Sequence, residues 1–163
     1  MKIAVSVLAA LLLSVPAQAE GDFAMRILAA HNSERAALNI PPLRWDEGLA
    51  ANAAVWAKHL ADTGTFEHAD ATTRSEEGEN LWEGTAGGYS LEQMVAMWAA
   101  EKRYFSAGTF KGSVVDGHPI GHYTQMIWRN TTSIGCALAT ARGTDVLVCR
   151  YSPMGNFLGE AVY

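Results

Sequence analysis

The sequence predicts an α+β fold in which helices cover an antiparallel sheet. Three segments with helical periodicity come first along the chain, and three segments of extended character follow them. Helices and strands that are separated in this way are typical of layered α+β domains rather than of folds that alternate the two. The chain has 163 residues and shows neither an internal repeat nor a linker, so we expect a single folded domain.

A first helix is expected over residues 23–38, where apolar residues recur at the spacing of one helix face. Pro41 and Pro42 enforce an extended backbone and prevent the helix from continuing. His31 and Asn32 lie in the middle of this segment. A polar side chain in that position must either point into solvent or find a hydrogen-bond partner.

A second helix is expected from about Glu47 to Asp62. Asp46 is a suitable N-cap because its carboxylate can accept a hydrogen bond from a free backbone N–H. Gly64 is a suitable C-cap because glycine readily adopts the left-handed conformation. A third helix begins at Ser90, which forms the capping-box pattern with Gln93.

Two glutamates are expected close to the core. Glu79 lies in an irregular acidic segment, residues 65–88, directly before the apolar pair Leu81-Trp82. Glu101 follows Trp98 by about one turn on the apolar stripe of the third helix. The alternative for Glu101 is an exposed position at the edge of that stripe, paired with a neighbouring basic residue.

The central strand is expected at residues 121–128, GHYTQMIW, after a glycine-rich loop over residues 106–120. Alternation along a strand would place large apolar groups and hydrogen-bonding groups on both faces. Each buried polar group on such a strand needs a partner. The partners of His122 are therefore the question that the rest of the chain must answer.

The last two strands are expected near residues 134–141 and 144–151, joined by a two-residue turn at Arg142-Gly143. This register places Cys136 opposite Cys149, and a disulfide is expected between them in an exported protein. Closing so short a loop stabilises the fold by roughly 3 kcal/mol in the chain-entropy model. Two free buried thiols are the alternative.

The N-terminus reads as a signal peptide. A positive start, Met1-Lys2, precedes an apolar run over residues 3–15, and Ala17-Gln18-Ala19 has the small-x-small pattern of a cleavage site. We expect a signal peptide over residues 1–19, a mature domain over residues 20–163, and a secreted or periplasmic location. The apolar run is too short to span a bilayer, although a retained anchor is the alternative.

The formal net charge of the chain is −5. A net negative charge argues against binding to nucleic acid and against electrostatic binding to anionic lipid. No later stretch is long and apolar enough to cross a membrane, so stable insertion is not expected either.

Four motifs resemble those of the CAP superfamily, which comprises cysteine-rich secretory proteins, antigen 5 and pathogenesis-related group 1 proteins and whose domain is also called the SCP domain. They occur in the family's order and extend over most of the chain that follows the predicted cleavage site. The four motifs are HNSER at residues 31–35, GENL at residues 78–81, GHYTQMIW at residues 121–128, and CRYSPMGNF at residues 149–157.

The resemblance implies a three-layer α-β-α sandwich with a central cavity lined by two histidines and two acidic residues. Carried over residue by residue, these are His68 in FEH (residues 66–68), Glu79 in GENL, Glu101 in WAAE (residues 98–101) and His122 in GHYTQ. The chain has a single pair of cysteines and no cysteine-rich C-terminal extension. The low cysteine count and the character of the predicted signal peptide point to a bacterial member of the family.

The cavity permits two interpretations. In one, His68 and His122 bind Zn²⁺ or another divalent metal, and Glu79 or Glu101 acts as general base in a hydrolase. The sequence spacing alone gives no support for a metal site. In the other, the four side chains form a polar network that holds the fold together without a metal.

A third possibility follows from the resemblance, since some family members bind sterols or fatty acids. Residues 106–120, with Phe105 and Phe110, could frame an apolar groove, although these aromatic rings could equally be ordinary core. We therefore expect an exported binding module for a small apolar ligand, a sterol or fatty acid, or for a partner surface. The alternative is a divalent-metal-dependent, protease-like hydrolase that uses the histidine and glutamate cavity.

Overall fold

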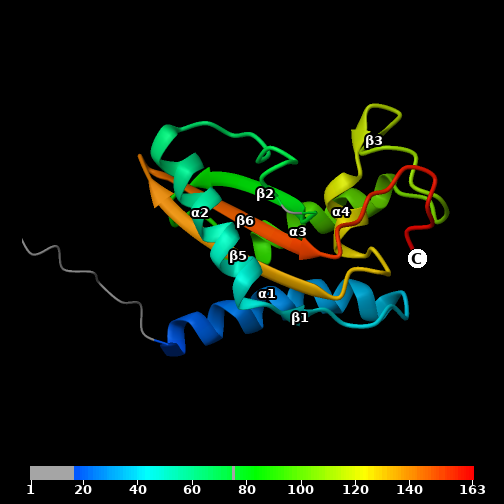
Figure 1. The fold of residues 1–163 in the computed structure, drawn as a ribbon, viewed down its shortest axis with the longest axis horizontal. Coiled ribbons are helices and arrows are strands. Elements are labelled where there is room, and N and C mark those ends of the chain that lie inside the picture. Colours follow the sequence, from blue (N-terminus) through cyan, green and yellow to red (C-terminus); the bar gives the residue numbers. More distant parts are fainter. Residues whose placement is uncertain (1–16, 75) are drawn as a thin grey trace, which may run out of the picture.

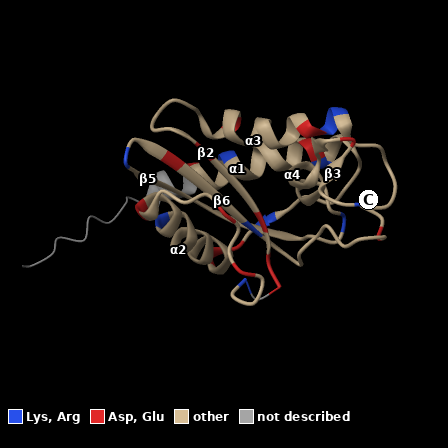
Figure 2. Ribbon diagram, turned by 90° about the horizontal axis from the view of Figure 1, so that it is seen from above, with Lys and Arg blue, Asp and Glu red and all other residues tan. Residues whose placement is uncertain are grey.

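The computed structural model describes residues 17–74 and 76–163, and most of the expected signal peptide lies outside this range. Cleavage after Ala19 therefore stays a prediction. Within the described part of the chain, no helix has the length and apolar character needed to cross a membrane. Basic and acidic residues are distributed along the ribbon, and both signs occur at the end that carries α4 (Figure 2).

The fold is the expected three-layer α-β-α sandwich (Figure 1). One four-stranded sheet, in the order β1-β5-β6-β2, forms the middle layer, and α2 covers one face while α1 and α3 lie on the other (Figure 2). The helices are α1 (Ala17–Ala37), α2 (Glu47–Thr63), α3 (Leu91–Ala99), the 3₁₀ helix η1 (Ala100–Tyr104) and α4 (Gly121–Met126). The strands are β1 (Arg44–Trp45), β2 (Gly78–Thr85), β3 (Val114–Val115), β4 (His118–Pro119), β5 (Ser133–Ala141) and β6 (Thr144–Ser152).

Strand β6 lies in the interior of the sheet, and its residues contribute to a core on each side. Val146 and Val148 pack into the cluster beneath α2, whereas Leu147 and Tyr151 belong to the larger cluster on the face of α1 and α3. A strand that is buried on both faces needs apolar residues at successive positions. The sheet is antiparallel except for β1, which pairs in parallel with β5.

The local signals for helix ends are confirmed. The Asp46 carboxylate accepts a hydrogen bond from the backbone N–H of Leu49, and Gly64 ends α2 in the left-handed conformation with φ of 71°. Ser90 and Gln93 form both hydrogen bonds of the capping box at the start of α3. These caps explain why α2 and α3 begin close to the expected residues.

The hairpin of β5 and β6 also has the expected register. Arg142 and Gly143 form the turn with φ of 53° and 79°, and Cys136 lies opposite Cys149. The two cysteines form a disulfide with an S–S distance of 2.04 Å. Positive φ at both turn positions matches the right-handed twist of the strands that the turn connects.

Two expectations about extended segments are wrong. Residues 121–128 do not form the central strand, because Gly121–Met126 is the helix α4, whose first turn is bound by a side chain from outside the helix. Residues 65–88 are not irregular throughout, because Gly78–Thr85 is strand β2 and pairs with β6 along its whole length. Both errors arise from partners that are distant in the sequence.

Gly135 allows α2 to approach the sheet closely. A Cβ atom at this position would overlap the backbone of Asp46, Leu49 and Ala50 in the first turn of α2. The overlap is with backbone atoms, so it cannot be relieved by a change of side-chain rotamer.

We expect the G135A variant to lower the free energy of unfolding by about 2 to 3 kcal/mol, because the helix must move away from the sheet. Urea denaturation would measure the loss. The matched control is G48A, where the added Cβ meets only the side-chain oxygen of Asp46. Equal stability of G135A and the unchanged protein would contradict this account of the packing.

Candidate functional site

A cavity of about 270 Å³ lies between the sheet edge and α4, and three of the four side chains expected from the sequence line it. His68 comes from the segment after α2, Glu79 from β2 and His122 from the first turn of α4. Glu101 does not line the cavity and lies behind His122. The lining residues are His68, Glu79, Asn80, Ser113, Val114, Pro119, Gly121, His122 and Asn156.

The imidazole of His122 is held by the buried carboxylate of Glu101. Nδ1 of His122 lies 2.6 Å from Oε1 of Glu101, and Oε2 accepts hydrogen bonds from the backbone N–H groups of His122 (3.0 Å) and Tyr123 (3.1 Å). The ring of Trp98 stacks on the imidazole with 6.1 Å between centroids. Because an ionised carboxylate only accepts hydrogen bonds, Nδ1 of His122 is the donor in this contact, and Nε2 is the ring nitrogen left available to a ligand.

The imidazole of His68 is held in a similar way by Glu79. Nδ1 of His68 lies 2.7 Å from Oε1 of Glu79, and the same oxygen accepts the backbone N–H of Ala69 at 3.1 Å. The carboxylate of Glu79 is completely buried, whereas the side chain of His68 is 57% exposed. Nε2 of His68 is therefore the ring nitrogen that is free to meet a ligand.

The structure brings the four expected residues together as two separate histidine–glutamate pairs. Of the other three residues of this set, only Glu101 forms hydrogen bonds with His122. In the described part of the chain, no group of three or more His, Cys, Asp or Glu side chains is placed to hold a metal ion.

Sequence reasoning missed the charged side chains behind Glu79. Nη2 of Arg150 lies 2.9 Å from Oε2 of Glu79, and Nη1 donates a hydrogen bond to Glu77 (3.2 Å). Asn52 in turn donates to Glu77 at 2.6 Å. Arg150 belongs to the CRYSPMGNF motif, but it meets Glu77 and Glu79 only because β2 pairs with β6, so no local sequence signal indicates this contact.

A buried polar network connects the cavity to α1. Nδ1 of His31 donates to the carbonyl of Ile27 (2.9 Å), and Nε2 accepts from the hydroxyl of Tyr151 (3.0 Å). Asn80 donates to that hydroxyl and to the backbone carbonyl of His122, both at 3.1 Å. Burial lowers the pKa of His31 to about 4 and raises the pKa of Tyr151 well above its usual range.

Two other residues of the HNSER motif, Asn32 and Arg35, form hydrogen bonds with backbone groups. Arg35 is buried and donates to the carbonyls of Met126 (3.0 Å), Trp128 (2.9 Å) and Thr131 (2.9 Å). Burial lowers its pKa to about 10, and the charge of Arg129 adds to the effect. Asn32 exchanges two hydrogen bonds with the backbone of Leu43. The motif therefore fixes α1 against α4 and β1.

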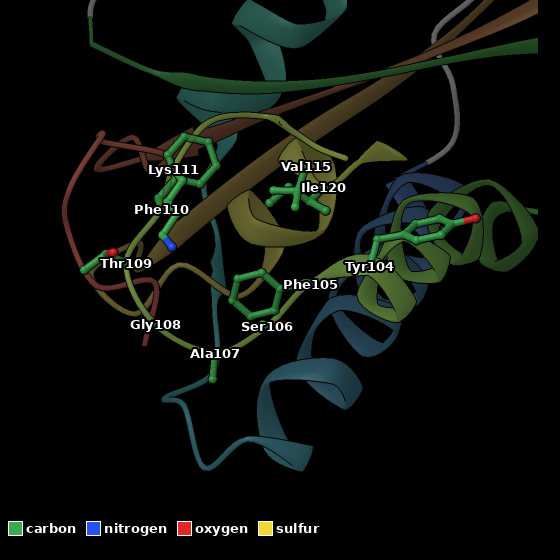
Figure 3. Close-up of a pocket in the computed structure, with 10 residues that line it drawn as sticks. All are labelled: Tyr104, Phe105, Ser106, Ala107, Gly108, Thr109, Phe110, Lys111, Val115 and Ile120. Atoms are coloured by element: carbon green, nitrogen blue, oxygen red, sulfur yellow. The ribbon is translucent and has the colours of Figure 1, made fainter. Parts of the chain in front are cut away.

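A second cavity, of about 370 Å³, lies in the segment that was expected to frame an apolar groove. Phe105, Phe110 and Ile120 are arranged around it, whereas the ring of Tyr104 points away (Figure 3). Phe110 is also core, because it is buried and packs edge-on against Trp128. The lining residues are Tyr104, Phe105, Ser106, Ala107, Gly108, Thr109, Phe110, Lys111, Val115 and Ile120.

Comparison with known proteins gives consistent matches. The family described as "Cysteine-rich secretory protein family" matches residues 28–151. Pathogenesis-related protein 1A of Nicotiana tabacum is 37% identical over 137 residues, which is 83% of this chain and 78% of that protein. Pathogenesis-related protein PR-1 of Medicago truncatula is 35% identical over 145 residues, which is 87% of this chain and 80% of that protein.

Solved structures agree on the fold. A crystal structure of NaASP2 with Zn²⁺ superimposes with a TM-score of 0.73 at 23% identity, and it covers 87% of this chain and 85% of that one. At this identity the likeness supports the fold alone. The two relatives named above come from plants, so the bacterial origin expected from the sequence stays a prediction without support here.

The neutral His31 makes stability depend on pH. Its pKa is about 4 in the folded protein and 6.5 when unperturbed, so the unfolded chain binds more protons between these values and stability falls as the pH is lowered through this window. We expect the free energy of unfolding to drop by about 2 kcal/mol between about pH 7 and about pH 5 from this group alone. Urea titrations at the two pH values measure the drop, and the H31Q variant should show a smaller one. An equal drop in H31Q would contradict the assignment.

Proposed function

Because the chain belongs to the cysteine-rich secretory protein family, we propose that it acts outside the cytoplasm as a binding module for a small apolar ligand. The family description itself refers to secretion. The disulfide between Cys136 and Cys149 supports export, since such bonds persist in oxidising compartments.

The observation that carries the proposal is the cavity of about 370 Å³ between the end of η1 and the loop before α4. Its volume lies in the range typical of small-molecule sites. Phe105, Phe110, Val115 and Ile120 provide apolar walls, and the hydroxyl groups and ammonium of the loop provide a few polar contacts. A ligand with an apolar body and one polar or anionic end, such as a fatty acid or a sterol, matches this lining.

The hairpin of β3 and β4 offers a matched pair of variants to test this site. Val115 lines the apolar cavity, whereas its neighbour Val114 lines the histidine cavity. We expect V115W to fill the apolar cavity and to weaken the binding of a fluorescent fatty acid by roughly tenfold or more, which corresponds to about 1.4 kcal/mol. We expect V114W to leave that affinity nearly unchanged. Fluorescence titration of the mature domain measures both. Saturable binding that V115W does not alter would place the ligand elsewhere.

A second candidate function is divalent-metal binding in the histidine cavity. Its support is that Glu79 and Glu101 hold Nδ1 of both histidines and leave each Nε2 available. Histidines that bind metals commonly donate their other ring N–H to a carboxylate in this way. The donor set suits Zn²⁺ and similar ions, with the remaining positions left for water or a ligand. NaASP2, which shares the fold, has been crystallised with Zn²⁺.

The hydrolase alternative requires a general base, and the geometry favours one of the two glutamates. Glu101 does not line the cavity, and both of its oxygens already accept hydrogen bonds. Glu79 does line the cavity. A metal-dependent hydrolase would therefore use Glu79, the one of the two that borders the cavity, although its carboxylate is completely buried and each of its oxygens already has a partner. We propose metal binding ahead of hydrolysis, since the oxygens of both glutamates are already engaged by hydrogen bonds or by Arg150.

Isothermal titration of the mature domain with zinc tests the metal site. We expect H68A and H122A each to weaken zinc binding by roughly tenfold or more, because each removes one of two protein ligands. H59A is the control, since His59 lies on α2, stacked on Trp56 and outside the cavity. An isotherm that is unchanged in both cavity variants would show that the ion binds elsewhere.

A further inference from the structure

We propose that Tyr104 and His118 form a latch, which holds the β3–β4 hairpin as a wall of the apolar cavity and whose release lets a ligand enter and leave. The inference rests on the proposed function, because it concerns access to the cavity of about 370 Å³ that was proposed to bind an apolar ligand. It gives a role to the ring of Tyr104, which points away from that cavity (Figure 3), and to His118, which does not line it.

The first step is the contact between the two rings. The rings of Tyr104 and His118 are parallel, with 3.8 Å between their centroids. The guanidinium carbon of Arg103 lies 4.7 Å from the centroid of the Tyr104 ring. Tyr104 belongs to η1 and His118 to β4, so the stack connects two elements that are separated in the chain. A contact between aromatic rings changes an equilibrium by roughly 2-fold to 10-fold.

The second step is that η1 provides a fixed support for Tyr104. The buried carboxylate of Glu101 accepts the backbone N–H groups of His122 and Tyr123, which joins η1 to α4. Nζ of Lys102 donates to Glu34 of α1 at 3.0 Å, which joins the next residue of η1 to the first helix. The hairpin is therefore the partner of the stack that can move.

The third step is the attachment of the hairpin itself, which projects from the body of the molecule (Figure 1). At its base, the carbonyl of Ser113 accepts hydrogen bonds from the backbone N–H groups of Ile120 (2.8 Å) and Gly121 (3.2 Å). Gly112, directly before this base, has φ of 132°, a conformation that favours glycine. The hairpin is thus closed at its base, and β4 packs against η1 near its tip.

The fourth step links the stack to the cavity wall. Val115 lies directly opposite His118 in the register of the hairpin, and Val115 is the hairpin residue that lines the apolar cavity. The pair formed by Val114 and Pro119 lies nearer the base. The stack therefore acts on the pair of residues that includes the cavity wall. Breaking the stack would let the tip of the hairpin move outward and open the cavity beside Val115.

Thiol labelling of a V115C variant tests the latch in the ligand-free protein. The chain has only two cysteines, and they form a disulfide, so the new thiol is the only one that reacts. At one fixed neutral pH, we expect H118A and Y104A each to raise the labelling rate by roughly 2-fold to 10-fold. V114C is the matched control. Val114 is 61% exposed, so its labelling rate should stay nearly unchanged.

Further variants separate the latch from a general loss of structure. His118 is exposed and Tyr104 is half-buried, so both alanine variants should fold. Y104F and H118F each keep an aromatic ring and should leave the labelling of V115C nearly unchanged. The double variant Y104A/H118A should label no faster than either single variant, because all three remove the same contact. The amide of Ile120 should keep its protection from hydrogen exchange, because the hairpin moves as a unit.

Stopped-flow fluorescence tests whether the latch controls ligand exchange. We expect H118A to raise the dissociation rate of a fluorescent fatty acid by the same factor as the labelling rate of V115C. The association rate should rise equally, because the ligand passes the open hairpin in both directions. The dissociation constant should therefore stay nearly unchanged, in contrast to the loss of affinity expected for V115W.

Unchanged labelling of V115C in the folded variants H118A and Y104A would overturn the latch. Loss of protection at Ile120 would also overturn it, because the hairpin would then unfold instead of moving as a unit. An unchanged dissociation rate alongside faster labelling would overturn its role in ligand exchange. Failure of the proposed function is distinguishable, since it would appear as the absence of saturable fatty-acid binding in the unchanged protein. The labelling comparison needs no ligand and decides in either case whether Tyr104 and His118 hold the hairpin.

Discussion

The position of α4 depends on two buried charged side chains that bind its two ends. A helix of six residues leaves most of its backbone polar groups without partners inside the helix. Glu101 accepts N–H groups at the first turn, and Arg35 donates to the carbonyls of Met126 and Trp128 at the other end. Because the first turn of α4 carries His122, the geometry of the cavity follows from this arrangement.

The sequence allowed good predictions wherever the determining contacts are local. The caps of α2 and α3, the turn at Arg142-Gly143 and the pairing of the cysteines each depend on residues a few positions apart or on one hairpin register. The helical state of residues 121–126 was missed, since it depends on Glu101 and Arg35, which are distant in the chain. Strand β2 was missed for a similar reason. Its glycine, acidic and amide residues are poor strand formers, and only pairing with β6 makes the segment extended.

In the candidate site too, some features follow from the local sequence and others depend on contacts between distant segments. Three of the four residues named from the resemblance line one cavity and Glu101 binds His122 from outside it, but this arrangement as two pairs could not be inferred without the fold. The two buried arginines also differ in a way that residue type does not indicate. Arg35 is satisfied by carbonyl groups alone, whereas Arg150 lies between two carboxylates. Arg35 therefore satisfies backbone carbonyl groups, whereas Arg150 places a positive charge beside Glu79, the carboxylate that binds His68.

The small hairpin of β3 and β4 forms a common wall between the two cavities. Successive residues of a strand point to opposite sides, so Val114 borders the histidine cavity and Val115 borders the apolar cavity. A bulky ligand that pushed this hairpin outward from one cavity would narrow the other cavity. A movement of the hairpin backbone for one occupant would therefore change the fit of the other, whereas a change of the side chain at residue 114 or 115 alters only the cavity that it borders.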